Sequence, residues 1–394
     1  MNNKTILIIL VILLVAIFGA FYIKSNGLLN YESDNLIDSK NNILTEEIKG
    51  EKEFSNINIT SISKNNEVLY QTLQKIGIEK AMDLLIKESS GGSVYDCHQE
   101  SHQIGRIGYK IEKEKSFESC SADCHSGCYH GAMESLLIEK GTANLANDVM
   151  EVCRKFETSF GNFECLHGVG HGILAYFDYD MPQTITECKK LPDTFSQSSC
   201  YGGMFMENIL TGQGLGASQN KTHQTEWVNK TDPYFPCNKI NKDHVLQYQC
   251  YQMQTSWMLN LARYDFKKVS EQCINAPNNM QQACFKSLGR DVAGYTLRNP
   301  QKIIEICDIA PKQNNYYMDC IDGALNVIVD FWGPKLKNQA SELCSITKDP
   351  YKRICYQILA GRLPGLFKEL DKQKILCNTF EPAYQNLCEQ QKIQ

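Results

Sequence analysis

Apolar residues recur at helical spacing in short runs, and each run ends or begins at a cysteine. Before a cysteine the chain reads Ala-Asn-Asp-Val-Met-Glu-Val-Cys153 in one place and Gln-Lys-Ile-Ile-Glu-Ile-Cys307 in another. After a cysteine it reads, for example, Cys320-Ile-Asp-Gly-Ala-Leu-Asn-Val-Ile-Val. Loops with helix breakers such as Pro277 and Pro311 join the two kinds of run. This periodicity predicts amphipathic helices in helix–loop–helix units, and therefore an all-α fold.

The cysteines that bound these loops repeat with a regular period. Most pairs are separated by about 11 to 13 residues, and neighbouring pairs follow one another every 33 to 37 residues, with one exception. Such a period predicts stacked supersecondary units, here eight disulfide-stapled hairpins in an open solenoid or, alternatively, an α/α toroid. Closing a loop of this size stabilises the fold by about 3 kcal/mol. The expected disulfides are Cys120/Cys128, Cys153/Cys165, Cys188/Cys200, Cys237/Cys250, Cys273/Cys284, Cys307/Cys320, Cys344/Cys355 and Cys377/Cys388, with Cys97/Cys124 paired by elimination.

The one exception to the period lies between Cys200 and Cys250. Roughly fifteen extra residues are inserted there, beginning with the Gly-rich run after Thr211. The insertion follows the last histidine-bearing unit, so it is either a lid or rim of a site or a tolerated surface insertion.

The N-terminus carries the one long apolar run, Ile6 to Ile23, flanked by Lys4 and Lys24. Its length suits a membrane span, so residues 1–24 are predicted to be an uncleaved signal anchor. Residues 25–63 are polar and aperiodic and are predicted to be a flexible tether. The domain organisation continues with histidine-rich helical repeats in 64–236 and a cysteine-paired scaffold in 237–394.

Composition places the folded part outside the cytoplasm. Eighteen cysteines in regular pairs indicate an oxidising compartment. The chain is therefore expected to be a single-pass protein of the cell membrane with its bulk on the extracytoplasmic side. The net charge of −5, without a basic stripe, excludes nucleic acid as a partner.

Six of the eight histidines fall between Cys97 and Glu207. Residues four apart share one helix face, and three such pairs occur in neighbouring units. Imidazole suits Zn, Cu or Fe, so a transition-metal centre is predicted, with room for two ions. The predicted ligands are His98, His102, His130, Glu134, His167 and His171. Such a centre would serve redox or hydrolytic chemistry on a small substrate, or metal capture. In hydrolytic chemistry Glu134 or Glu207 would be the general base acting on a metal-bound water.

Arg106 and Tyr109 follow His102 on the same helix face. They are predicted to contact a substrate or cofactor, and Arg106 to bind an anion or to pair with Glu134 or Glu207. A surface arginine is the alternative.

Other interpretations of the same residues stay open. The histidines can be structural in a non-catalytic scaffold that docks another envelope protein. Cys120-x-x-x-Cys124-His125 is one residue longer than a haem-attachment signature and offers a haem alternative, with His98 or His102 as the distal ligand. Cys120, Cys124 and Cys128 can also form an all-cysteine metal site. The sequence names neither the metal nor the substrate, and it does not decide whether the protein is an enzyme.

Overall fold

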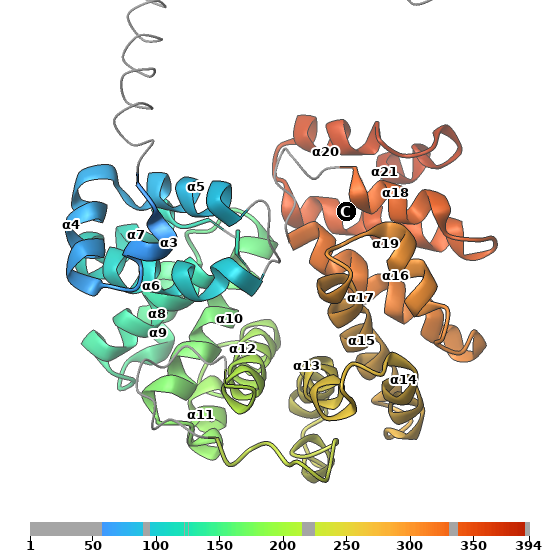
Figure 1. Ribbon diagram of the computed structural model, residues 1–394, viewed down its shortest axis with the longest axis horizontal. Helices are drawn as coiled ribbons and strands as arrows, with labels where there is room; N and C mark the ends of the chain where they lie inside the picture. The colour runs from blue at the N-terminus through green and yellow to red at the C-terminus, as the bar shows by residue number, and fades with distance from the viewer. Residues whose placement is uncertain are drawn as a thin grey trace, which may run out of the picture. The chain divides into compact units, whose positions relative to one another are not determined.

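The computed structural model describes residues 57–89, 95–121, 123–124, 126–214, 225–330 and 338–390, which form helices and loops without a strand (Figure 1). The chain divides into two units, Met1–Ile57 and Asn58–Gln394, and almost all described residues belong to the second. The expected membrane anchor and most of the expected tether lie outside the described residues. Among the helices that are described, none combines the length and the apolar character needed to cross a bilayer.

Two sets of helices alternate along the second unit. The long helices are α6 (Tyr95–Glu112), α8 (Gly127–Lys140), α10 (Ser159–Tyr176), α12 (Thr194–Gly212), α13 (His244–Ala262), α15 (Gln281–Tyr295), α17 (Tyr316–Asp330) and α19 (Tyr351–Leu366). The short helices are α7 (Ser116–Ser119), α9 (Leu145–Cys153), α11 (Met181–Cys188), α14 (Phe266–Asn275), α16 (Pro300–Cys307), α18 (Gln339–Ile346), α20 (Leu370–Cys377) and α21 (Asn386–Gln390). Short 3-10 turns lie at η1 (Lys113–Lys115), η2 (Cys237–Lys239), η3 (Gln313–Asn315) and η4 (Pro382–Tyr384).

Three helices precede the cysteine-stapled part: α3 (Ile59–Ile62), α4 (Asn66–Ile76) and α5 (Ile78–Ser89). α3 covers the last residues of the stretch expected to be a tether, and Asn58 caps it. α4 and α5 contain no cysteine and pack on α6 through their apolar faces. They extend the helical part further toward the N-terminus than the cysteine period indicates.

Polar side chains cap the N-termini of several long helices, among them α10, α12 and α13. The side chain of Thr158 accepts a hydrogen bond from the backbone N–H of Gly161, and Asp193 does the same for Ser196 at the start of α12. Each cap satisfies a backbone donor that has no partner within the helix.

Disulfides join short helices to long ones. All nine expected pairs are bonded, with Cα–Cα distances between 5.3 and 6.0 Å. In most repeats the first cysteine lies at or near the end of a short helix and the second lies in a long helix. Cys237 instead begins η2, and Cys388 lies in the short helix α21. The predicted helix–loop–helix unit with a cysteine at each end of its loop is therefore confirmed.

Successive long helices contact one another from α6 through α19, and α19 also contacts α10. At that contact Ser159 Oγ donates to the carbonyl of Gly365 at 3.5 Å, and Lys368 pairs with Glu157 at 3.5 Å. The contacts among α10, α12, α13, α15, α17 and α19 therefore form a closed series, which an open solenoid would lack.

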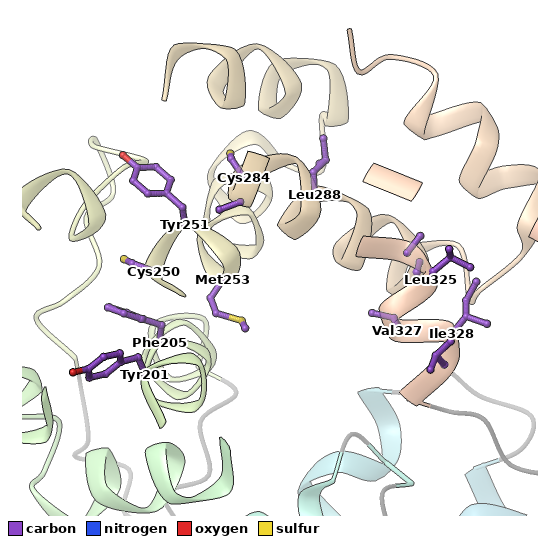
Figure 2. Packing of buried hydrophobic residues seen from close by; sticks show 14 of the residues in the cluster. Tyr201, Phe205, Cys250, Tyr251, Met253, Cys284, Leu288, Leu325, Val327 and Ile328 are labelled. Carbon is purple, nitrogen blue, oxygen red and sulfur yellow. The ribbon is translucent and has the colours of Figure 1, made fainter. Parts of the chain in front are cut away.

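Buried apolar side chains form a continuous core along this series. Figure 2 shows Phe205 of α12, Tyr251 of α13, Leu288 of α15 and Leu325 of α17 in it. Met253, two residues after Tyr251, points to the opposite side of α13.

Candidate metal centre

Five histidines from three consecutive long helices meet in one buried cluster, which we call the histidine cluster. His98 and His102 come from α6, His130 from α8, and His167 and His171 from α10. Their exposed fractions are between 0 and 7 %. The predicted same-face pairs thus face one another, while His125 lies outside the described residues.

Glycines allow the helices that carry the cluster to approach closely. A Cβ added at Gly131 of α8 would lie 1.9 Å from the carbonyl oxygen of His102. One added at Gly203 of α12 would lie 1.8 Å from the carbonyl oxygen of His167. Only a residue without a side chain fits such a crossing, so the glycines beside the histidines set the spacing of the cluster.

His130 lies at the centre of the cluster. Its ring centroid is 4.2 Å from that of His171, 5.2 Å from His102, 5.6 Å from His98 and 5.7 Å from His167. Both of its ring nitrogens are buried, and neither has a hydrogen-bond partner among the described residues. It belongs to two groups of three histidines that could each hold a metal ion, one with His98 and His102 and one with His167 and His171.

The hydrogen bonds at Nδ1 fix the tautomers of His98 and His102. His98 Nδ1 lies 2.8 Å from the carbonyl oxygen of Cys124, which can only accept, so Nδ1 carries the proton and Nε2 the lone pair. His102 Nδ1 lies 3.0 Å from Oε1 of Glu134, with the same consequence. The two Nε2 atoms are 3.2 Å apart. Two lone pairs at this distance repel each other unless a cation lies near both.

The ring of His171 is also oriented by a carboxylate at its Nδ1, here that of Glu207. Its Nδ1 lies 2.9 Å from Oε2 of Glu207, and Tyr179 donates its hydroxyl proton to Oε1 of Glu207 at 2.9 Å. Within the described part of the chain, Nε2 of His171 and Nδ1 of His167 are buried and have no hydrogen-bond partner. Histidines that ligate metals commonly donate their second N–H to a carboxylate or carbonyl in this way.

The electrostatics keep the imidazoles of His102, His130 and His167 neutral and the two carboxylates ionised. Burial, followed by the other histidines, holds the pKa of His130 well below the usual 6.5, and burial also lowers the pKa values of His102 and His167. Burial alone would raise the pKa of Glu134, but Arg106 and the hydrogen bond from His102 hold it at about 2. Burial also acts to raise the pKa of Glu207, but the hydrogen bond from His171 and the charge interaction with it together lower that pKa. Neutral imidazole is the form that binds metal ions.

Arg106 and Tyr109 lie in different surroundings. Arg106 donates from Nε to Oε2 of Glu134 at 2.5 Å, so it pairs with the carboxylate behind His102. Tyr109 is buried in the apolar core against Phe117, and its hydroxyl has no hydrogen-bond partner among the described residues.

Tyr179 and Thr211 were not singled out from the sequence. Thr211 Oγ1 lies 2.9 Å from the Tyr179 hydroxyl and 3.2 Å from Oε1 of Glu207. Tyr179 follows α10 in a turn with positive φ, and no motif marks either residue. Both residues contact Glu207 because α10 packs against α12.

The cysteines near the cluster are all in disulfides. Cys120 bonds to Cys128 and Cys124 to Cys97. Their sulfur atoms are therefore not available for thioether bonds to a haem or as thiolate ligands.

Comparisons with protein family models, curated proteins and solved structures found no match for this chain. The evidence for a metal centre comes from the histidine cluster itself. Buried imidazoles converge, their Nδ1 atoms are held by oxygen acceptors, and ring nitrogens that face one another lack partners among the described residues.

Proposed function

We propose that this chain is a membrane-anchored, extracytoplasmic protein whose histidine cluster binds transition metal ions. The observation that carries the proposal is the 3.2 Å separation of His98 Nε2 and His102 Nε2 while each Nδ1 faces an oxygen acceptor. A shared proton would relieve the repulsion only by making an imidazolium, which burial disfavours. A metal ion relieves it by accepting both lone pairs. Nine disulfides support an oxidising compartment, and the apolar run from Ile6 to Ile23 supports the anchor.

The proposed ligands are the five imidazoles of the cluster, and the two glutamates orient them. Glu134 already accepts from His102 and Arg106, and Glu207 from His171 and Tyr179. A carboxylate so occupied fixes the ring and raises the basicity of the ligating nitrogen. In this proposal Glu134 and Glu207 therefore take the orienting role in place of that of ligand or general base.

His130 gives the centre room for two ions. Each of its nitrogens is available within the described surroundings, and each group of three histidines brings its ligand atoms within 4.8 Å of one another. One ion bound by His98, His102 and His130 and a second bound by His130, His167 and His171 would share the central ring, which would then bind as an imidazolate after its remaining N–H proton is released to solvent. Zn, Cu, Fe and Ni all accept such nitrogen ligands.

Burial and the occupied carboxylates favour metal holding or electron transfer over hydrolysis. Hydrolysis at a metal needs a water on the ion and a base beside it. The pKa of about 2 makes Glu134 a weak base, and His102, His130 and His171 are at most 1 % exposed. The scaffold alternative, with purely structural histidines, does not explain why ring nitrogens of His130 and His171 are buried without partners in the described part of the protein.

The test is metal content and affinity of the full-length chain, purified in detergent with its disulfides formed. Wild-type protein incubated with Zn, Cu, Fe or Ni should retain one to two equivalents by elemental analysis. His130→Ala should lose at least half of this metal, because it removes the shared ligand. His244→Ala, an exposed histidine on α13, should bind as wild type does. Wild-type protein that binds none of the four metals, or His130→Ala with unchanged stoichiometry and affinity, would overturn the proposal.

A further inference from the structure

A cavity of about 450 Å³ lies among α10, α12, α13, α15, α17 and α19, the helices of the closed series. All six helices contribute lining residues. This volume is in the range of small-molecule binding sites. The cavity does not include the five histidines of the cluster among its lining residues.

The repeat directs its polar side chains into this cavity. Lys286 and Arg290 stand two and six residues after Cys284, and Asp322 and Asn326 stand two and six residues after Cys320. These are the register positions that His167 and His171 occupy after Cys165. The same face of the hairpin therefore carries imidazoles in one half of the chain and charged groups in the other.

The charged side chains of the lining are mostly cationic. Lys286, Arg290 and Arg362 line the cavity together with the single carboxylate of Asp322. Arg290 is fixed by Asp291 at 3.0 Å, and Asp322 pairs with both Lys286, at 2.9 Å, and Arg362. These three cations therefore face two carboxylates, those of Asp291 and Asp322, so the five groups together carry one net positive charge.

Two of these cations keep donors for a further acceptor. Arg362 donates through Nη1 to Asn326 and through Nη2 to Asp322, but its buried Nε has no hydrogen-bond partner among the described residues. The Lys286 ammonium has three N–H groups, and within the described part of the chain it donates to the carboxylate of Asp322. A buried donor without an acceptor costs free energy, which an anionic ligand would recover.

Part of the cavity lining is aromatic. Phe160 and Phe163 of α10 and Phe195 of α12 contribute three rings, and Met253, Val329 and Leu366 add further apolar surface. Phe195 is 46 % exposed, so burying its ring against a ligand would remove apolar surface from water.

We propose that this cavity binds a small organic anion. Its carboxylate or phosphate group pairs with Lys286 and Arg362, and its aromatic or aliphatic part packs on the three phenylalanines. The proposed anion site does not depend on the metal centre. The two sites are neighbours, however, because Phe163 of the cavity packs on His167 of the histidine cluster with ring centroids 5.4 Å apart.

The full-length protein in detergent is first passed over a chelating resin, so that the result does not depend on bound metal. Calorimetric titration of this metal-free protein then tests the proposal. The probes are phenyl phosphate, phenylacetate, inorganic phosphate and benzyl alcohol. Phenyl phosphate or phenylacetate should bind at least tenfold more tightly than inorganic phosphate and benzyl alcohol, because only the organic anions use both the cationic and the aromatic lining. The tighter of the two identifies the anionic group.

Variants assign the binding to this cavity. Arg362→Gln should weaken binding of the organic anions about tenfold through loss of a charge-assisted contact. Asp322→Asn should tighten it severalfold, because it removes the competing carboxylate. Phe195→Ala should weaken the organic anions but leave inorganic phosphate unchanged, and Lys312→Gln, an exposed cation that pairs with Asp308, is the control. The proposal is overturned if none of the four probes binds at millimolar concentration, or if the Arg362 and Asp322 variants shift affinity in the same direction.

Discussion

The two halves of the helical array use one building unit for different chemistry. In α6 to α12 the inward register positions carry His130, His167 and His171, and in α13 to α19 they carry Lys286 and Arg290. The disulfide and the apolar stripe are the same in both halves. The hairpin therefore specifies where a side chain points, and the identity of two positions per unit specifies what it can bind.

Packing at the residue three after the second cysteine differs from helix to helix. This residue is Gly131 in α8, Gly203 in α12 and Gly323 in α17, but Met253 in α13. An added Cβ would lie 1.9 Å from the His102 carbonyl oxygen at Gly131 and 1.9 Å from the Lys286 carbonyl oxygen at Gly323, so close crossings occur in both halves. Beside the histidine cluster the close crossings keep the imidazoles buried. In α13 the side chain of Met253 instead contributes to the lining of the cavity.

The largest expected effect comes from filling one of the close crossings. Gly131→Ala places a Cβ 1.9 Å from the His102 carbonyl oxygen, so α6 and α8 must move apart. We expect a loss of about 3 kcal/mol in the free energy of unfolding and at least tenfold weaker metal binding. Denaturant unfolding with intact disulfides and metal competition measure the two effects.

Gly361→Ala in α19 is the matched control in the other half. Nothing lies within 4 Å of its added Cβ. Replacing a helical glycine by alanine should stabilise the protein by about 1 kcal/mol. Equal effects of the two substitutions would contradict the difference in packing between these two sites.

The next effect concerns the carboxylates that orient the histidines. Glu134→Gln keeps an oxygen near His102 Nδ1 but removes the charge that faces Arg106. Metal affinity should fall about 10- to 100-fold, as for other partners of ligating histidines. Glu139→Gln, at an exposed carboxylate of the same helix, is the control. Metal affinity is measured by competition with a chelating dye, and unchanged affinity in Glu134→Gln would exclude the orienting role.

Much of the fold was predictable because the cysteine period and the apolar stripes are local signals. Both recur in each hairpin, so they predicted the helix–loop–helix units, the disulfide pairs and the shared helix face of pairs such as His167 and His171. The helices α4 and α5 lie within the stretch 64–236 that was predicted to be helical, but their bounds were not predicted, because they carry no cysteine.

Features that depend on contacts between helices could not be predicted in the same way. Whether Glu207 is a ligand or an acceptor behind His171 depends on how α10 meets α12, and nothing local in the sequence encodes that distance. The contact of α19 with α10 joins residues about two hundred positions apart. The cavity and its charges follow from that contact, so they also escaped prediction.

The smallest expected effect is a pH dependence on the cavity side. Burial raises the pKa of Asp319 from its ordinary 3.8 to about 6, and the hydrogen bond from Gln282 offsets this only in part. Between pH 3.8 and 6 the folded protein therefore binds more protons than the unfolded chain, so this group's contribution to stability is lost as the pH rises through that window. The neutral amide of Asp319→Asn keeps an acceptor for Gln282 without the buried charge.

Asp319→Asn should accordingly raise the free energy of unfolding at pH 7 by about 1 kcal/mol, a value that is reduced for partial solvent screening. At pH 3.5 the same substitution should leave the free energy of unfolding nearly unchanged. The measurement is denaturant unfolding of the metal-free protein at both pH values. The sign opposes that on the metal side, where lowered histidine pKa values make the folded state less stable as the pH falls below 6.5. If Asp319→Asn instead destabilised the protein at pH 7, the attraction between the ionised Asp319 and Lys286 would outweigh the cost of burying the carboxylate.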